Sequence, residues 1–273
     1  MRGDFLVYKV AMNNYKKEEI EHYDKLAREW QEKTVEGKAR DARGDIEMIE
    51  VMKMSSYRFV YGLLEKYIPG KRVLDYGCGH GMHTTEIAKI GATEVIGVDL
   101  SEKSLNIAEE RAKKEGLSEK IKFIKMDAEK LEFPENSFDI VFDGGTFSSI
   151  DISKGLPEIA RVLKTGGYLI GIETLGHHPL ANLKRRLNKK RGIRTDWAAS
   201  HIMKMKDFKL ARQYFDVIEI RFFHFVSLTA IPFQNFPGGS ILIKFTETID
   251  KIIFALLPFL KRYGFKTVFV LQK

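Results

Sequence analysis

The hydrophobic pattern of the chain divides it into three parts. Between residues 16 and 66, apolar residues recur at helical spacing among many charges, which predicts helices interrupted near Gly37 and Gly44. From Arg72 to Thr174, short apolar runs alternate with amphipathic segments. After Thr174 this alternation ends, and long basic and apolar segments follow.

The middle part predicts an α/β fold. Its apolar runs predict strands at 73–76, 94–100, 121–126, 138–142 and 168–173. The intervening segments predict helices at 82–90, 101–114 and 156–163, the second of them capped by Ser101. The last part adds a helix at 206–214 and strands at 217–225 and 267–271. Because strands that alternate with helices pair mostly in parallel, we expect a doubly wound sheet with helices on both faces.

The composition is that of a globular chain. Its 273 residues are 44% hydrophobic and 30% charged, which suits one large domain with additions. No run of about 18 apolar residues is present, so no membrane-spanning helix is expected. The first ten residues include Asp4 and do not resemble a signal peptide. With Cys78 as the single cysteine, no intramolecular disulfide can form, and we expect a cytoplasmic location.

The positive charge is concentrated in the last third of the chain. From Leu175 to Lys273 there are 18 Lys or Arg and 6 Asp or Glu residues, a net charge of +12 in a chain of +8. Residues 184–194 hold seven of these cations, and residues 180–187 predict an amphipathic helix with leucines on one face. Such a block favours an anionic partner: a phosphorylated substrate, a membrane surface or a nucleic acid.

A glycine-rich turn follows the first predicted strand. Residues 75–81 read D-Y-G-C-G-H-G and lead into a helix. Glycines permit positive φ angles and the close approach of a ligand, and the N-terminus of the helix offers free N–H groups. Asp99 ends the next strand, where a carboxylate can accept hydrogen bonds from both ribose hydroxyls. Asp127 and Ala128 end the third strand, where a carboxylate can hold an adenine amino group.

Together these motifs resemble those of the class I S-adenosylmethionine-dependent methyltransferases, of the small-molecule type. The later motifs of that family match G-V-D-L-S around Asp99, D-A followed by L-E-F-P-E-N-S-F-D, and L-K-T-G-G at 163–167. The resemblance implies a Rossmann-like, mostly parallel, seven-stranded sheet with an antiparallel last strand. It also implies S-adenosylmethionine as the cofactor. We divide the chain into an N-terminal helical lid region, residues 1–68, and a methyltransferase domain, residues 69–273, with cap insertions at about 175–205 and 227–265.

The resemblance also implies roles for site residues. Asp75 and the glycine turn would hold the methionine part of the cofactor, Asp99 its ribose and Asp127 its adenine. Residues 143 and 144, after the fourth strand, would line the methyl-transfer cleft. Tyr23 would close over the cofactor as part of a lid, or its helix would simply pack on the sheet. The expected cofactor-binding residues are Asp75, Gly77, Cys78, Gly79, Gly81, Asp99, Leu100, Asp127, Ala128, Asp143, Gly144 and Tyr23.

Competing interpretations exist for the glycine turn. An NAD site would need G-x-G-x-x-G, whereas the spacing here is G-x-G-x-G. Cys78 is interpreted as a small packed residue rather than a nucleophile, because no obvious partner base lies nearby. No group of His, Cys, Asp or Glu has metal-ligand spacing, so no metal is expected.

Three histidines are candidates for a general base in the acceptor site. His177 and His178 directly follow the fifth predicted strand, where the cleft is expected, and His201 precedes the next helix. Histidine suits this role because its ordinary pKa lies near neutrality. The alternative for each is a structural or surface histidine.

The expected function is methyl transfer to a small, hydrophobic or lipid-linked acceptor, with oxygen slightly favoured over nitrogen or carbon. The basic segment and the apolar stretch 227–265 also predict peripheral contact with an anionic membrane surface. One alternative is an RNA or protein methyltransferase that uses the basic third, although no N-P-P-Y motif for planar nitrogens is present and nucleic acid is the less favoured partner. A second alternative is a non-enzymatic cofactor-binding protein. The sequence leaves the oligomeric state open.

Overall fold

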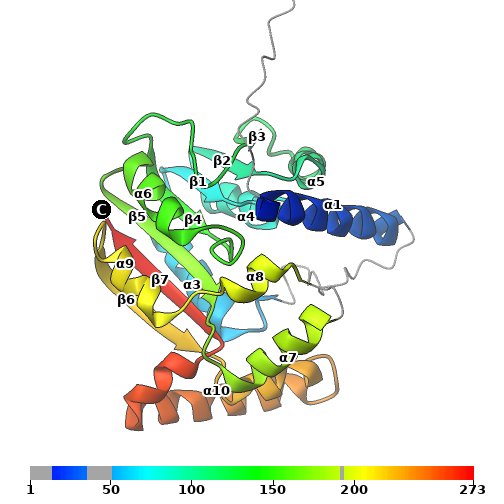
Figure 1. Ribbon diagram of the computed structural model, residues 1–273, viewed down its shortest axis with the longest axis vertical. Helices are drawn as coiled ribbons and strands as arrows, with labels where there is room; N and C mark the ends of the chain where they lie inside the picture. The colour runs from blue at the N-terminus through cyan, green and yellow to red at the C-terminus, as the bar shows by residue number, and fades with distance from the viewer. Residues whose placement is uncertain (1–13, 36–50, 191–193) are drawn as a thin grey trace, which may run out of the picture.

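Seven strands pair into one sheet in the structure, a computed structural model that describes residues 14–35, 51–190 and 194–273 (Figure 1). The strands are β1 (Arg72–Tyr76), β2 (Glu94–Asp99), β3 (Ile121–Lys125), β4 (Phe138–Asp143), β5 (Leu163–Thr174), β6 (Asp216–Phe223) and β7 (Lys266–Gln272). Their order in the sheet is β3-β2-β1-β4-β5-β7-β6. β1 to β5 pair in parallel, whereas β7 is antiparallel to both β5 and β6. The expected mostly parallel sheet with an antiparallel last strand is confirmed.

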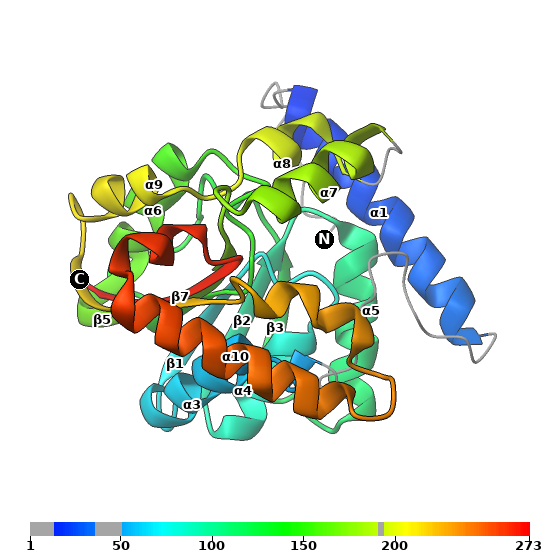
Figure 2. The ribbon, with the colours of Figure 1, turned by 90° about the horizontal axis from the view of Figure 1, so that it is seen from below.

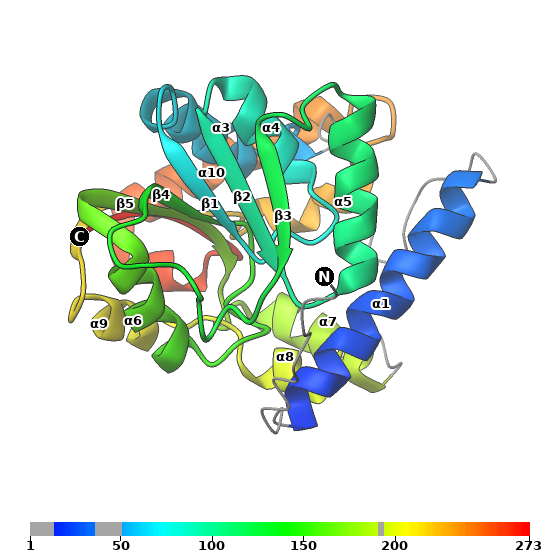
Figure 3. The same ribbon diagram turned by 90° about the horizontal axis from the view of Figure 1, so that it is seen from above.

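Helices cover both faces of this sheet (Figure 3). They are α1 (Asn14–Val35), α3 (Ser55–Tyr67), α4 (Met82–Ile90), α5 (Glu102–Lys114), α6 (Ile152–Val162), α7 (Pro179–Lys190), α8 (Asp196–Ser200), α9 (Met205–Ala211) and α10 (Gly239–Leu256). Three short 3-10 helices, η1 (Ser227–Thr229), η2 (Ile231–Phe233) and η3 (Pro258–Tyr263), flank α10. Within the described part of the chain, no helix is long and apolar enough to cross a membrane.

The two sides of the sheet take alternate residues of the central strands. On β1, Leu74 and Tyr76 belong to the core that includes α6 and α9, whereas Val73 belongs to the core that includes α3, α4 and α5. All three side chains are fully buried. Because both faces are covered, the central strands appear in the sequence as continuous apolar runs rather than as an alternation.

Two helices begin where a polar side chain satisfies their first N–H groups. The predicted cap of α5 is confirmed, since Ser101 Oγ accepts a hydrogen bond from the Ser104 N–H at 3.1 Å. α6 begins at Ile152 rather than at the predicted residue 156, because Asp151 accepts a hydrogen bond from the Ser153 N–H and supplies a cap that the sequence analysis missed.

One carboxylate attaches the insertion between β6 and β7 to the rest of the fold. Asp250, buried on α10, accepts hydrogen bonds from the N–H groups of Phe225, Val226 and Ser227 at 3.1, 2.6 and 3.2 Å, and from the Ser227 hydroxyl at 2.7 Å. These donors follow β6 at the point where the chain leaves the sheet. They hold α10 alongside the start of α3, where Glu247 of α10 accepts a hydrogen bond from the Ser55 N–H (Figure 2).

Replacing Asp250 with alanine is expected to destabilise the protein by about 3 kcal/mol, because three backbone N–H groups lose their acceptor at once. Urea unfolding monitored by circular dichroism measures this loss. The control is Thr248→Ala, an exposed position on the same helix. An Asp250→Ala variant as stable as this control would show that α10 is attached by other contacts.

Candidate functional site

A cavity of about 230 Å³ opens at the carboxyl ends of the parallel strands. We call it the glycine-turn cavity. Its walls come from the turn after β1, the end of β2, the loop after β4 and one face of α1. The lining residues are Glu19, Ile20, Tyr23, Gly77, Gly79, Asp99, Leu100, Ser101, Met126, Ala128, Gly144, Gly145, Thr146, Ser149 and Ile150. In open α/β sheets, ligands bind at this edge.

The three glycines of the turn have two different structural roles. All three have positive φ angles: 72° at Gly77, 53° at Gly79 and 78° at Gly81. A Cβ on Gly77 would lie 2.2 Å from the Oγ1 atom of Thr146, and one on Gly81 would lie 2.7 Å from Cβ of Ala108. A Cβ on Gly79 would meet nothing within 4 Å. Gly77 and Gly81 therefore permit close packing, whereas Gly79 leaves the backbone open toward the cavity.

Asp99 lies directly beside this open backbone, in the same wall of the cavity. Its carboxylate accepts hydrogen bonds from the Gly79 N–H at 2.9 Å and from the Ser101 N–H at 2.8 Å. Burial raises the pKa of Asp99, while these donors oppose the shift by stabilising the anion. The two bonds fix the carboxylate against the turn, and the residue still contributes to the cavity wall.

Asp75 lies behind the turn rather than in the cavity. It is 1% exposed, and its Oδ2 atom accepts a hydrogen bond from the Thr84 hydroxyl of α4 at 2.5 Å. Burial raises the pKa of this carboxyl from its ordinary 3.8 to about 7. Cys78 is also buried, and burial raises the pKa of its thiol well above the ordinary value. Both residues shape the turn from the core side.

Two buried carboxyls meet behind the loop that follows β4. Asp143 accepts hydrogen bonds from the Thr146 and Gly145 N–H groups, and Glu173 at the end of β5 accepts one from the Phe147 N–H at 2.7 Å. Burial first, and then the neighbouring Glu173 carboxyl, raise the pKa of Asp143 well above its usual range. Burial also raises the pKa of Glu173. One proton shared between the two avoids placing two negative charges side by side.

Helix α1 forms the roof of the glycine-turn cavity. Glu19, Ile20 and Tyr23 line it, and the Tyr23 hydroxyl lies 2.9 Å from Ser149 Oγ. Two turns before Tyr23, Lys16 Nζ contacts the carboxylate of Asp127 at 2.5 Å. Helix α1 therefore lies over the glycine-turn cavity, and its closing over a cofactor stays a prediction.

The segment between β5 and β6 supports this roof from the other side. Trp197 of α8 stacks between Tyr15 of α1 and His201, with ring centroids 3.7 and 3.5 Å apart. Thr195 donates a hydrogen bond to Glu19, and the Arg194 guanidinium donates one to Ser148 Oγ at 3.1 Å. Parts of the chain that are distant in sequence thus meet at one end of α1.

The structure brings together most of the predicted cofactor residues. Those that line the cavity are Tyr23, Gly77, Gly79, Asp99, Leu100, Ala128 and Gly144. Those outside the lining are Asp75, Cys78, Gly81, Asp127 and Asp143. The Asp127 carboxylate, expected to hold adenine, is bound by Lys16, whose proximity no sequence pattern indicated. The sequence analysis also missed Thr146 and Ser149, although both stand in the G-G-T-F-S-S run directly after β4.

None of the three candidate histidines lines the cavity. His178 is 2% exposed; its Nδ1 accepts a hydrogen bond from the Ala181 N–H, and its Nε2 lies 2.9 Å from the Phe225 carbonyl oxygen. Both nitrogens are engaged with the backbone, so this side chain has a structural place. His177 Nε2 accepts a hydrogen bond from the Met205 N–H, and burial lowers its pKa.

The predicted basic helix is α7, and the leucines of its apolar face are exposed: Leu180, Leu183 and Leu187 are 53, 57 and 48% exposed. Arg185 takes the inward position, where it donates a hydrogen bond to the Leu175 carbonyl oxygen at 3.0 Å, and burial lowers its pKa to about 10. Arg191 lies outside the described residues.

The buried Asp75 predicts a pH dependence of stability. Because its pKa is raised by folding, the folded protein binds a proton that the unfolded chain releases between about pH 4 and 7. The wild type is therefore expected to lose on the order of 4 kcal/mol of stability from this group as the pH rises through that window. Asp75→Asn is expected to lack this loss.

Urea unfolding of both proteins between pH 4 and 8 measures the difference. The control is Glu102→Gln, an exposed partner of Lys125 on α5, which is expected to follow the wild-type curve. Parallel curves for Asp75→Asn and the wild type would contradict a raised pKa at Asp75.

The fold and the cavity define a Rossmann-like domain for a nucleotide-containing cofactor. A family model described as "Methyltransferase domain" matches residues 74–171, from β1 into β5. The matched region contains the glycine turn, Asp99 and Gly144. The chain therefore contains a class I S-adenosylmethionine-dependent methyltransferase domain.

Curated relatives match the same part of the chain. A sterol 24-C-methyltransferase from Gibberella zeae is 43% identical over 100 residues, which are 36% of this chain and 26% of the relative. An eEF1A lysine and N-terminal methyltransferase from Bos taurus is 30% identical over 136 residues, 46% of this chain and 19% of the relative. This chain thus covers only about a fifth to a quarter of these relatives.

Similarity in fold extends further than similarity in sequence. The solved structure of a geranyl diphosphate methyltransferase in complex with geranyl diphosphate and sinefungin superposes with a TM-score of 0.56 at 15% identity. The superposition covers 79% of this chain and 76% of that one. It supports the Rossmann-like methyltransferase fold beyond the matched domain.

Proposed function

We propose that the chain binds S-adenosylmethionine in the glycine-turn cavity and transfers its methyl group to a small acceptor. The single observation that carries this proposal is the pairing of an open backbone at Gly79 with the fixed carboxylate of Asp99, inside a methyltransferase domain. Of the three glycines in the turn, Gly79 alone has no atom within 4 Å of a Cβ position, so its backbone is the one that a ligand can approach closely.

Different residues of the cavity are proposed to bind different parts of the cofactor. S-adenosylmethionine supplies an electrophilic methyl group on a sulfonium. Asp99 is placed to accept hydrogen bonds from ribose hydroxyls, while Gly79 allows the close approach of the amino-acid part. Ile20 and Tyr23 on α1 exclude water from above. The protein then contributes chiefly by aligning the acceptor for an in-line displacement.

The acceptor is proposed to be hydrophobic or lipid-linked. The Gibberella relative is named for a sterol, and the described residues after Thr174 expose much apolar surface. Oxygen stays the slightly favoured acceptor atom from the sequence analysis, although that relative is named for a carbon. The general base that would activate the acceptor stays a prediction, with His177 and His201 as the remaining candidates.

Two alternatives stay open. A protein or RNA acceptor is favoured by the basic last third and by the similarity to the eEF1A methyltransferase. A non-enzymatic cofactor-binding protein would keep the same cavity. Turnover with protein, RNA and lipid extracts as acceptors, each with radiolabelled methyl donor, separates these cases.

Calorimetric titration with S-adenosylmethionine and S-adenosylhomocysteine tests the donor site. We expect both to bind the wild type, and Asp99→Asn to weaken binding by about tenfold or more, because a charge-assisted hydrogen bond to ribose is lost. The matched control is Glu102→Gln, which lies three residues further on and outside the cavity. Binding of NAD in place of both compounds would refute the proposal.

The protein is further proposed to associate peripherally with anionic membranes. On α7, exposed Leu180, Leu183 and Leu187 lie among exposed Lys184 and Arg186, an arrangement suited to an interface of acyl chains and negative head groups. A cytoplasmic location is part of the same proposal.

Flotation with vesicles tests the membrane proposal. We expect the wild type to float with phosphatidylglycerol-containing vesicles and less so at high salt, because the lipid attraction is screened. Lys184→Glu with Arg186→Glu is expected to float several-fold less. The control, Lys113→Glu with Lys114→Glu, makes the same change of charge on α5. A wild type that stays unbound, or a control that loses binding equally, would argue against α7 as a membrane contact.

A further inference from the structure

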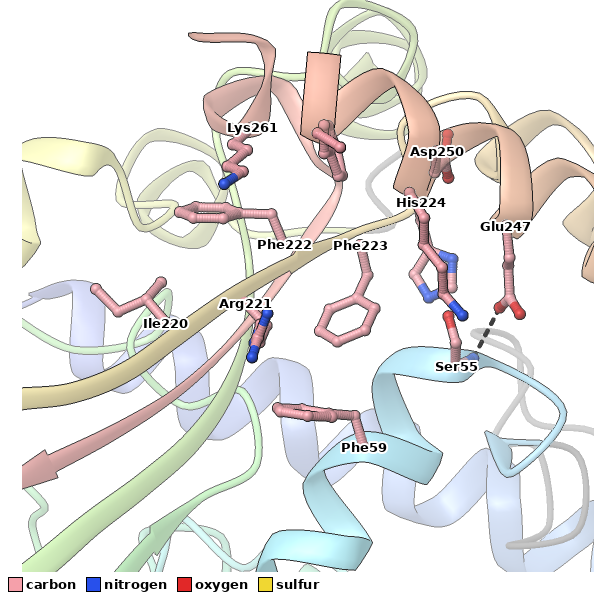
Figure 4. A pocket seen from close by; sticks show the side chains of 13 residues that line it. Ser55, Phe59, Ile220, Arg221, Phe222, Phe223, His224, Glu247, Asp250 and Lys261 are labelled. Carbon is pink, nitrogen blue, oxygen red and sulfur yellow. Dashed lines mark hydrogen bonds between the residues drawn. The ribbon is translucent and has the colours of Figure 1, made fainter. Parts of the chain in front are cut away.

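A second and larger cavity, of about 450 Å³, lies between β6, the start of α3 and α10 (Figure 4). We call it the β6–α10 cavity. No residue lines both this cavity and the glycine-turn cavity. Its size falls within the ~300–1,000 Å³ typical of small-molecule sites, and the methyl-transfer function proposed above does not use it.

Aromatic side chains form much of its wall. Phe59 from α3, Phe222 and Phe223 from β6, and Phe254 from α10 all line it. The rings of Phe59 and Phe223 are 5.6 Å apart, and the first three side chains keep part of their surface exposed. Such partly exposed aromatic surface favours an apolar occupant, because burying it removes that surface from water.

The buried polar residues around the cavity are already engaged in holding the fold. Asp250 accepts four hydrogen bonds at the end of β6, and Glu247 pairs with Arg58 at 3.0 Å. His224 lies 2.8 Å from Ser56 Oγ through Nε2, and burial lowers its pKa to about 3, so its ring is neutral. None of these groups is available to bind a cationic or strongly polar ligand.

Cations stand at the rim. Arg221 is paired with Glu219 at 2.7 Å, whereas Lys251 and Lys261 form no ion pair with any described residue. Figure 4 shows Lys261 reaching toward Phe222, so that an ammonium group and an aromatic ring face the same space. Both lysines are exposed. The rim therefore offers positive charge above an apolar interior.

The surface around the cavity has the same character. In the fully described stretch 227–263, the acidic residues are Glu247 and Asp250, and both are buried. Its exposed side chains include Ile252, Leu256 and Phe259, which are 53, 74 and 67% exposed. A surface of cations and apolar groups without exposed carboxylates complements a molecule with a negative head and an apolar tail.

We propose that the β6–α10 cavity binds a single anionic amphiphile, with its apolar chain against Phe59, Phe223 and Phe254 and its carboxylate or phosphate head at Lys251 and Lys261. A free fatty acid and an acidic membrane lipid share this chemistry. The site requires neither the methyl donor nor a bilayer, so its occupancy is measured separately from donor binding and from vesicle flotation.

Calorimetric titration with monomeric dodecanoate, below its micelle concentration, tests the site in the full chain. One molecule is expected to bind. Octanoate is expected to bind at least about tenfold more weakly, because each buried methylene contributes about fourfold. Inorganic phosphate alone is expected not to bind. Lyso-phosphatidylglycerol competing with dodecanoate identifies a membrane-lipid source, and failure to compete identifies the free acid.

Matched variants on α10 locate the binding. Lys251→Ala is expected to weaken dodecanoate binding about fivefold to tenfold, whereas Lys244→Ala, an exposed lysine outside the cavity, is expected to leave it unchanged. Ala255→Trp is expected to fill the cavity and abolish binding, with Thr248→Trp as its control.

Several outcomes overturn the proposal. It fails if dodecanoate does not bind, if inorganic phosphate binds as tightly as dodecanoate, or if Lys244→Ala weakens binding as much as Lys251→Ala. It also fails if a folded Ala255→Trp variant binds dodecanoate like the wild type. S-adenosylmethionine titration of the same variants is expected to be unchanged, which separates this site from the donor site.

Discussion

The candidate site depends on how closely the loop after β4 approaches the turn after β1. Thr146 donates a hydrogen bond from its hydroxyl to the Tyr76 carbonyl oxygen at 2.7 Å, and only the absence of a Cβ on Gly77 leaves room for it. The same loop continues to Phe147, whose N–H is accepted by Glu173 at the end of β5. The carboxyl ends of β1, β4 and β5 are thereby joined into one continuous floor beneath the glycine-turn cavity.

Three carboxyl groups are buried in and around this floor, where water does not reach them. Asp75, Asp143 and Glu173 are each at most 1% exposed, and burial raises the pKa of all three. The arrangement is tolerable because the backbone N–H groups of the turning loops converge there and because protonation removes charge. The edge of the sheet that suits a polar cofactor is therefore also an edge where buried carboxyls lose their stabilising protons as the pH rises.

The sequence predicts those features of the site that depend on residues close together in the chain. The glycine turn, Asp99 and the capped start of α5 each follow from residues within a few positions of one another, and the structure has them where the sequence indicated. The contacts of α1 over the cavity are harder to predict from sequence, because the pairing of Lys16 with Asp127 depends on where α1 crosses the sheet. For the same reason no sequence pattern indicates that Arg185, one of many cations in its segment, points from α7 into the fold.

The stack of Tyr15, Trp197 and His201 joins the first described helix to the segment between β5 and β6. A contact between positions so far apart in sequence carries a large loop-closure cost, which must be met before the contact contributes any stability. Trp197 follows β1 to β5 in the sequence, so α1 is synthesised long before the ring on which Tyr15 stacks. The earliest described helix of the chain therefore depends for this contact on a segment synthesised after every parallel strand of the sheet.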